Sequence, residues 1–175
     1  MMKRLGTGLI LVLLATQADA VMLVRGVREF ALSGYLNRTT DFNLSLTAKS
    51  GKFIRDFVQI GPMGSFRWIE GGDVLLLGGG MFGEINVPMH EHPLLFPYYG
   101  ATASALYSDI DDRFGGNSRL AVAVSGYGGM KYFLQDNLAI GADLEIKLAT
   151  AKIYFGDNKL QNFDWVINLS TRFFF

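Results

Sequence analysis

Cysteine is absent from the 175 residues of this chain, and histidine and proline are scarce, with two and four residues. Without cysteine the chain can form no disulfide, which excludes the cross-linked scaffold of many small exported domains. Two histidines and no thiol also leave few ligands for zinc, which takes three or four from the protein. No apolar run approaches the roughly 20 residues that a membrane-spanning helix needs.

The N-terminal segment has the three parts of an export signal. Lys3 and Arg4 form a positive start, residues 9–15 form a short apolar core, and the small-x-small sequence ADA at 18–20 provides a cleavage site. This order is typical of a secretory signal peptide. We therefore predict a signal peptide at 1–20.

The mature domain is predicted to span 21–175, which is enough for one domain. Its charges are balanced: the whole chain has a formal charge of 0, and removing two basic residues and one acidic residue with the signal leaves −1. No basic block or stripe remains, so nucleic acid is not expected as a partner.

Apolar residues make up half of the chain, yet they are dispersed among 21 glycines and many small polar residues. Alternating segments of about ten residues, separated by turn residues, are typical of a transmembrane β-barrel. We predict eight strands, each with an apolar face and a polar or small face. They span residues 28–37, 42–53, 57–69, 74–87, 98–108, 119–134, 138–155 and 163–175.

The final strand, 163–175, alternates without a slip up to Phe175. Such a strand needs a partner for its edge, and pairing with the first strand would close a barrel that has no edges. Pro62 cannot donate to a sheet and so predicts a bulge or a local break in the third strand. The phase of strand 74–87 is ambiguous, and segment 88–97, which holds both histidines, is expected to be irregular.

Two segments of the chain repeat one pattern 80 residues apart. GKFIRDFVQIG at 51–61 aligns without gaps with KYFLQDNLAIG at 131–141, with Phe, Asp, Ile and Gly at matched positions. Each segment is expected to form a strand, a tight turn and a strand. Both turns then lie at the same end of the barrel, as an even number of strands requires.

Alternation alone does not decide which face lies outside, because a soluble lipocalin-like carrier also has eight alternating strands. Placing Lys147, beside Asp143 and Glu145, in lipid near mid-membrane would cost roughly 2–4 kcal/mol. The polar faces are rich in small residues that suit the narrow interior of an eight-stranded barrel. Aromatic residues lie towards the ends of several apolar faces, as in the girdles of outer-membrane barrels. These features favour lipid on the outside.

Taken together, the exported precursor, the eight strands, the hairpin motif at 131–141 and the final strand ending in Phe175 resemble the small outer-membrane β-barrel, or porin-like, family of Gram-negative bacteria. The resemblance covers nearly all of the mature chain. It implies an eight-stranded antiparallel up-and-down barrel in the bacterial outer membrane, surrounded by outer-membrane lipid, and we expect a monomer. Members of this family differ in function, so the resemblance implies location and fold rather than activity.

The resemblance also implies that the terminal strand carries an insertion signal recognised by the barrel-assembly machinery. The corresponding positions are Ile167, Leu169, Thr171, Phe173 and Phe175. Thr171 departs from the pattern, since a larger apolar residue is expected there.

Catalytic and metal-binding chemistry has little support in the sequence. His90-Glu91-His92 is the one cluster of metal-ligand types, but no further His or Cys completes a zinc site. A lipid deacylase would need a base beside a nucleophile, and both histidines lie outside the predicted strands. Nucleophile-elbow and phosphate-loop motifs are also absent. We therefore expect no enzyme, no metal and no cofactor.

Nine charged residues are expected to face the lumen, and buried charges persist when they are paired and hydrogen-bonded. They are Glu29, Arg67, Glu84, Lys131, Asp143, Glu145, Lys147, Asp164 and Arg172. The simplest prediction is a structural or surface protein whose lumen is filled by side chains. The alternatives are a narrow channel or hydrophobic-ligand conduit in the outer membrane, and a soluble carrier. Short outer loops are expected at 38–41, 70–73 and 156–162, with a longer one at 109–118.

Overall fold

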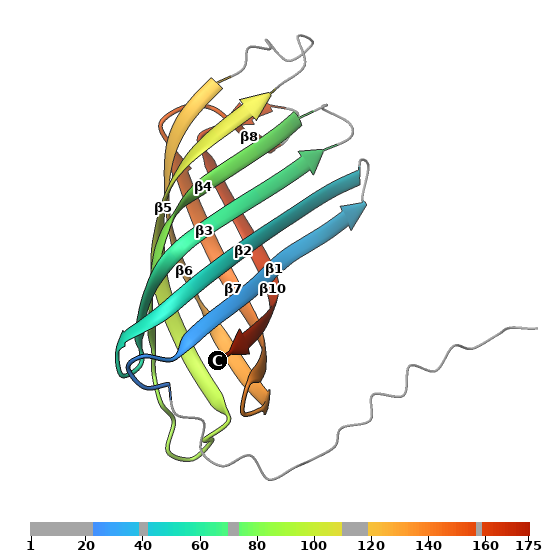
Figure 1. The fold of residues 1–175 in the computed structure, drawn as a ribbon. Helices are drawn as coiled ribbons and strands as arrows, with labels where there is room; N and C mark the ends of the chain where they lie inside the picture. The colour runs from blue at the N-terminus through green and yellow to red at the C-terminus, as the bar shows by residue number, and fades with distance from the viewer. Residues whose placement is uncertain (1–22, 39–41, 70–73, 110–118, 157–158) are drawn as a thin grey trace, which may run out of the picture.

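The computed structural model describes residues 23–38, 42–69, 74–109, 119–156 and 159–175. The predicted signal peptide lies outside these residues, and so do most of the four predicted outer loops. Eight strands form a closed antiparallel barrel, and two short strands form a separate hairpin (Figure 1). No helix among the described residues is long and apolar enough to cross a membrane.

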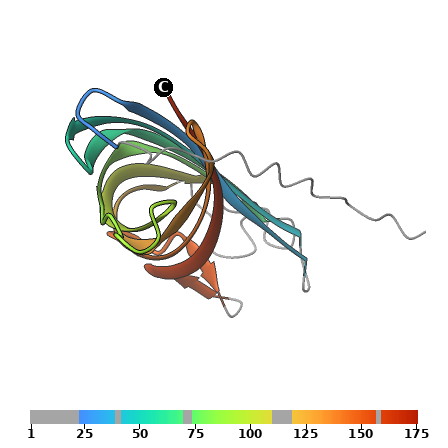
Figure 2. The ribbon, with the colours of Figure 1, turned by 90° about the horizontal axis from the view of Figure 1, so that it is seen from below.

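Each barrel strand pairs with its neighbours in the chain, and β10 closes the barrel against β1. Seen from below, the strands curve round a common axis (Figure 2). The predicted eight-stranded antiparallel up-and-down barrel is therefore confirmed. The barrel strands are β1 (Arg28–Arg38), β2 (Phe42–Arg55), β3 (Val58–Ile69), β4 (Val74–Asn86), β5 (Leu95–Asp109), β6 (Arg119–Gln135), β7 (Leu138–Ala149) and β10 (Phe163–Phe174), and the hairpin consists of β8 (Tyr154–Gly156) and β9 (Lys159–Gln161).

The predicted faces of the strands are also confirmed. Along β10, Val166 and Asn168 are buried, whereas Ile167 and Leu169 between them are 59% and 68% exposed. On β4, whose phase was ambiguous, Glu84 is buried and faces inwards. Bulky apolar side chains thus cover the outside of the barrel, whereas the inside combines small and polar side chains with buried aromatic rings such as Phe53 and Phe133.

The predicted seventh strand, 138–155, is too long, because β7 ends at Ala149. Ile153 and Tyr154 are adjacent in the sequence, yet both are buried. A strand directs consecutive side chains to opposite faces, so it cannot bury both residues on one face. The chain therefore leaves the barrel after β7 and turns back as the β8–β9 hairpin.

The prolines have different effects on the barrel. The irregular segment is shorter than the predicted 88–97, because β5 begins at Leu95 and includes Pro97. The Pro97 carbonyl accepts a hydrogen bond from the amide of Val87, which follows the end of β4. Because Pro97 faces this residue, its missing N–H removes no hydrogen bond from the ladder between β4 and β5. Pro62 pairs with Met81 in β4, but the β2–β3 pairs stop at Met63 and resume at Ile60. The local break expected at Pro62 is present without a change of register.

The two repeated segments form matching hairpins. Both the β2–β3 turn and the β6–β7 turn lie at the lower end of the barrel (Figure 1). Each has a register shift at the same place, between Phe53 and Arg55 in one and between Phe133 and Gln135 in the other. Bulges increase the local twist, so both hairpins bend the end of the sheet. Phe53 and Phe133, directly before the shifts, follow the alternation of their strands into the lumen, where both are buried.

The seam between the first and last strands is incomplete. β1 pairs with β10 from Glu29, opposite Phe174, to Gly34, opposite Leu169. Above this point β1 stays paired with β2 and β10 stays paired with β7. The two strands diverge towards the upper end (Figure 1). The barrel is therefore closed by hydrogen bonds in its lower half.

Candidate functional site

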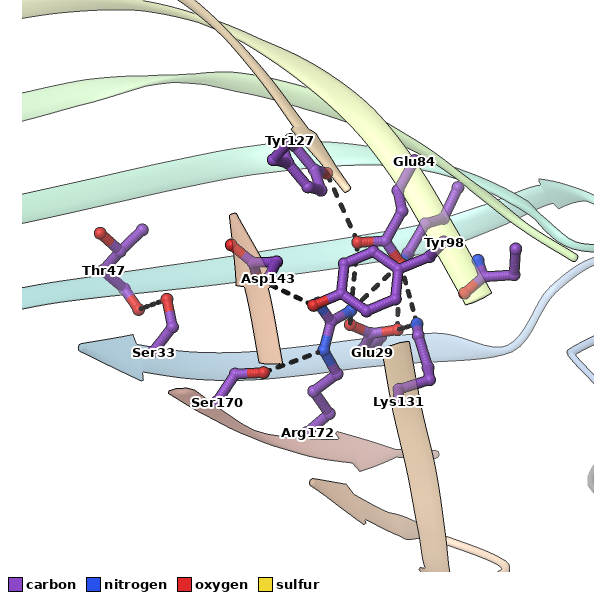
Figure 3. Close-up of polar contacts among 12 residues, drawn as sticks. Glu29, Ser33, Thr47, Glu84, Tyr98, Tyr127, Lys131, Asp143, Ser170 and Arg172 are labelled. Atoms are coloured by element: carbon purple, nitrogen blue, oxygen red, sulfur yellow. Dashed lines mark hydrogen bonds and ion pairs between the residues drawn. The ribbon is translucent and has the colours of Figure 1, made fainter. Parts of the chain in front are cut away.

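The lumen contains a compact cluster of four charged side chains, shown in Figure 3. The Arg172 guanidinium lies 2.7 Å from Glu29 and 3.1 Å from Glu84. The Lys131 ammonium lies 3.1 Å from Glu29 and 2.8 Å from Glu84. Each cation thus contacts both carboxylates, and the cluster is electrically neutral. We call these four residues the central cluster.

Four different strands supply the central cluster: β1, β4, β6 and β10. All four residues are at most 2% exposed. They meet because each occupies an inward position and because eight strands enclose a space only wide enough for side chains. Charges so deeply buried are stable only when they are paired and fully hydrogen-bonded. Because β1 and β10 are neighbours while β4 and β6 lie elsewhere in the closed sheet, the ion pairs of the cluster connect different walls of the barrel.

Uncharged polar groups complete the cluster. The Gln59 side-chain amide donates to Glu29 and to Glu84, at 2.9 Å each, and its own oxygen accepts no hydrogen bond among the described residues. The Arg172 guanidinium also stacks over the Tyr98 ring at 4.2 Å. Gln59 and Tyr98 had not been identified as site residues from the sequence, since neither is charged.

A second group lies above the central cluster. Asp143 accepts hydrogen bonds from the Tyr98 hydroxyl at 2.8 Å and from the Asn168 amide at 3.0 Å. Asn168 also donates to Glu145 at 3.2 Å, and Glu145 pairs with Lys147 at 3.2 Å. The network therefore continues upwards along β7 and β10 from the central cluster.

An ion pair across the barrel forms the top of the network. Arg67 on β3 lies 2.7 Å from Asp164 on β10, although β1 and β2 separate these strands in the sheet. The Arg67 guanidinium also lies 5.8 Å from the centre of the Tyr35 ring on β1. These contacts link the walls at the level where β1 and β10 no longer pair.

All nine predicted lumen charges face inwards, but among the described residues one further buried charge was not predicted. Lys49 on β2 is 9% exposed, and its ammonium lies 3.9 Å from the centre of the Tyr127 ring. The nine predicted residues comprise five carboxylates and four cations, so Lys49 makes the set neutral. Lys49 lies on the polar face of the predicted second strand. The excess of one carboxylate among the nine predicted lumen charges was the signal that could have identified it.

An aromatic cluster fills the lower end of the lumen. Its buried members are Leu23, Phe53, Phe96, Phe133, Ala139 and Phe174. The Phe133 ring lies 5.4 Å from Phe96 and 4.9 Å from Phe174. Leu23 reaches this cluster because the segment before β1 folds under the barrel, where the Leu23 carbonyl accepts a hydrogen bond from the Phe57 amide at 2.8 Å. We call this set the lower cluster.

A second apolar cluster, which we call the upper cluster, lies at the upper end of the lumen. Its buried members are Val74, Leu76, Leu106, Ala121, Ala123, Ala149, Ile153 and Tyr154. Burial raises the pKa of the Tyr154 phenol, and the carboxylates of Asp164 and Glu145 raise it further. A cavity of about 50 Å³ between this cluster and Lys147 is large enough for a few water molecules. The described lumen is thus polar in the middle and apolar at both ends.

The histidine segment lies outside the lumen. His90, Glu91 and His92 are exposed in the connection between β4 and β5. Among the described residues, no group of three or more His, Asp or Glu side chains is arranged to hold a metal ion.

The five residues of the predicted insertion signal, from Ile167 to Phe175, all lie on the outer face of the last strand. Phe175 is 70% exposed, while its backbone pairs with Arg28. The structure therefore places these side chains as one outward row.

Comparison with known proteins identifies the fold. No protein-family model matches the sequence, and no curated protein matches it either. Among solved structures, Neisserial surface protein A has a TM-score of 0.58 and 16% identity, with 84% of this chain and 94% of that chain covered. The N-terminal β-barrel domain of OprF from Pseudomonas aeruginosa has a TM-score of 0.61 and 16% identity, covering 86% and 98%. The chain has the fold of these outer-membrane barrels.

Proposed function

We propose that this chain is an integral protein of the bacterial outer membrane with a structural or surface role, a lumen closed by side chains and no catalytic activity. The observation that carries the proposal is the distribution of polarity. The outer wall is apolar, and the described inner wall contains five carboxylates and five cations that form ion pairs, hydrogen bonds or contacts with aromatic rings.

The outer wall matches a lipid environment. Trp165 and Leu169 on β10 are 61% and 68% exposed, and comparable side chains cover the other strands. A soluble protein rarely exposes a continuous apolar surface of this kind. Strands of about 9–11 residues span a bilayer, and the barrel strands reach this length. This surface also argues against a soluble carrier, which would place these side chains inside.

The filled lumen argues against a channel. A solute would have to pass the lower cluster, the central cluster and the upper cluster in turn. Separating the central cluster would leave buried charges without partners, at a cost of several kcal/mol. A structural or surface role needs no such opening.

The direction of insertion follows from the ends of the barrel. The short β2–β3 and β6–β7 turns and the last strand's terminus lie at the lower end (Figure 1). In outer-membrane barrels the short turns are periplasmic. We assign the lower end to the periplasm, with the outward row of β10 presented to the barrel-assembly machinery during insertion, and we assign a monomeric state.

Electrophoresis of boiled and unboiled protein tests the membrane barrel. A folded barrel in detergent keeps its hydrogen-bonded shape, so the unboiled sample should migrate differently from the boiled one. Folding into detergent or lipid should be required for the shift. Identical migration of the two samples after such folding would contradict the proposal.

A further inference from the structure

An apolar groove crosses the outer wall of the barrel over β5, β6, β7, β10 and β1. Its volume is about 500 Å³, within the range of roughly 300–1,000 Å³ that is typical of ligand sites. The side chains that line it include the smaller Ala142 and Thr171 and the larger Leu32, Leu95, Met130, Tyr132, Ile140 and Leu169.

The register of the strands explains the groove. Ala142 lies directly between Met130 on β6 and Leu169 on β10. Both neighbours point outwards and are more than half exposed, at 51% and 68%. A methyl group between two long side chains leaves a depression on the wall. The strand register thus places a furrow at Ala142 on the outer wall.

A second cavity, which carries one carboxylate and one imidazole, adjoins this groove at the lower end. This cavity, of about 310 Å³, is lined by Glu91, His92, Pro93 and Leu94, and it shares Leu95 and Tyr132 with the groove. The Leu95 amide donates to the His92 carbonyl at 3.0 Å, which holds this connection against the start of β5. The two cavities therefore form one continuous surface that is mainly apolar except at Glu91 and His92.

We propose that this surface binds a phospholipid with an ethanolamine head group. One acyl chain would lie over Ala142, the ammonium group would face the Glu91 carboxylate, and the phosphate would face the His92 imidazole. The proposal rests on the membrane location proposed above, which surrounds the groove with lipid. It gives a role to the His-Glu-His segment, which the barrel itself does not use.

The two parts of the surface contribute unequally. Glu91 and His92 are exposed, and ionic contacts at exposed sites are weak. Acyl-chain burial scales with the apolar area covered and therefore supplies most of the affinity. The head-group contacts decide which lipid is preferred.

Native mass spectrometry of the folded protein in detergent, with palmitoyl-oleoyl phosphatidylethanolamine as the probe, tests the groove. Ala142→Phe fills the furrow and should weaken lipid binding about tenfold, a change of about 1.4 kcal/mol. Ala103→Phe is the matched control, because Ala103 is an outward-facing alanine on β5 outside the groove. Ala142→Leu is a smaller filling of the same furrow and should weaken binding several-fold. Equal lipid binding by the Ala142 variants and the control would overturn the proposal that the lipid binds in this groove.

The head-group contacts are tested with a diacylglycerol that has the same acyl chains. The wild type should prefer the phospholipid, and a Glu91→Gln/His92→Gln variant should lose this preference without binding diacylglycerol less. Equal binding of the two lipids by the wild type would overturn the head-group assignment. A shift on the detergent gel in every variant shows that the barrel is intact. Failure of the wild type to shift would contradict the membrane barrel, whereas a retained shift without lipid binding would contradict the groove alone.

Discussion

Arg172, on the last strand of the barrel, and Glu29, on the first, form an ion pair of 2.7 Å although 143 positions separate them in the sequence. Their strands also pair through the backbone, with Glu29 opposite Phe174. Glu84 and Lys131 extend this pair to the far wall. Glu29 and Arg172 therefore belong both to the paired seam of the barrel and to the charged cluster inside it.

Replacing Arg172 by Met should destabilise the barrel by about 3–5 kcal/mol, because Glu29 and Glu84 would share one remaining cation in a buried site. The matched control is Arg67→Met. Arg67 has one carboxylate partner, and that pair is partly exposed, at 13% and 17%. The control should cost about 1 kcal/mol. Urea unfolding in lipid vesicles, followed by tryptophan fluorescence, measures both, and equal losses would contradict the role of the central cluster.

The lower cluster should contribute a comparable amount of stability. Phe133→Ala removes a ring that is 1% exposed and packs against Phe96 and Phe174, which should cost about 3–5 kcal/mol. Phe30→Ala is the control, because Phe30 points outwards and is 40% exposed. Its loss should be about 1 kcal/mol, since lipid replaces most of its contacts. The same unfolding experiment compares the two, and a larger loss for Phe30→Ala would contradict a packed lower end.

The seam can be tested with engineered disulfides, because the chain has no cysteine. Ser33→Cys with Ser170→Cys places two thiols at directly paired positions. Paired strand residues lie about 4.5–5.5 Å apart at Cα, within disulfide range. Tyr35→Cys with Asn168→Cys occupies the next inward position, above the last pair of the ladder.

Mild oxidation of the folded protein should cross-link the Ser33/Ser170 positions and leave the Tyr35/Asn168 positions reduced. Gel mobility under non-reducing conditions reports the result. Equal cross-linking of both pairs would show that β1 and β10 pair over their full length.

Phe175 should matter more for insertion than for stability. Its side chain is 70% exposed, and its backbone hydrogen bonds with Arg28 survive in Phe175→Ala. The variant should lose less than about 1 kcal/mol of unfolding free energy, like other surface substitutions. Its assembly into vesicles that contain the barrel-assembly machinery should slow several-fold, whereas Trp165→Ala, an outward substitution on the same strand, should assemble normally. Equal losses of stability and of assembly rate would contradict the interpretation of Phe175 as part of an insertion signal.

Strand positions and faces were predictable because lipid and a narrow lumen impose a strict two-residue alternation. The same alternation misled at Ile153 and Tyr154, where the chain leaves the barrel while the apolar pattern continues. Leu23 could not be placed, since its burial depends on a segment that folds back beneath the barrel. The pairing partners of Arg172 were also hidden, because every inward charge has several candidates until the register is known.

The current through a planar bilayer that contains the folded protein is the most direct measure of the closed lumen. Pure protein, shown to be folded by its shift on a detergent gel, should leave the bilayer current at its baseline. Arg172→Met should also stay closed, because the lower cluster remains intact. Steady single-channel steps from the wild-type protein would contradict a lumen that is closed by the lower, central and upper clusters.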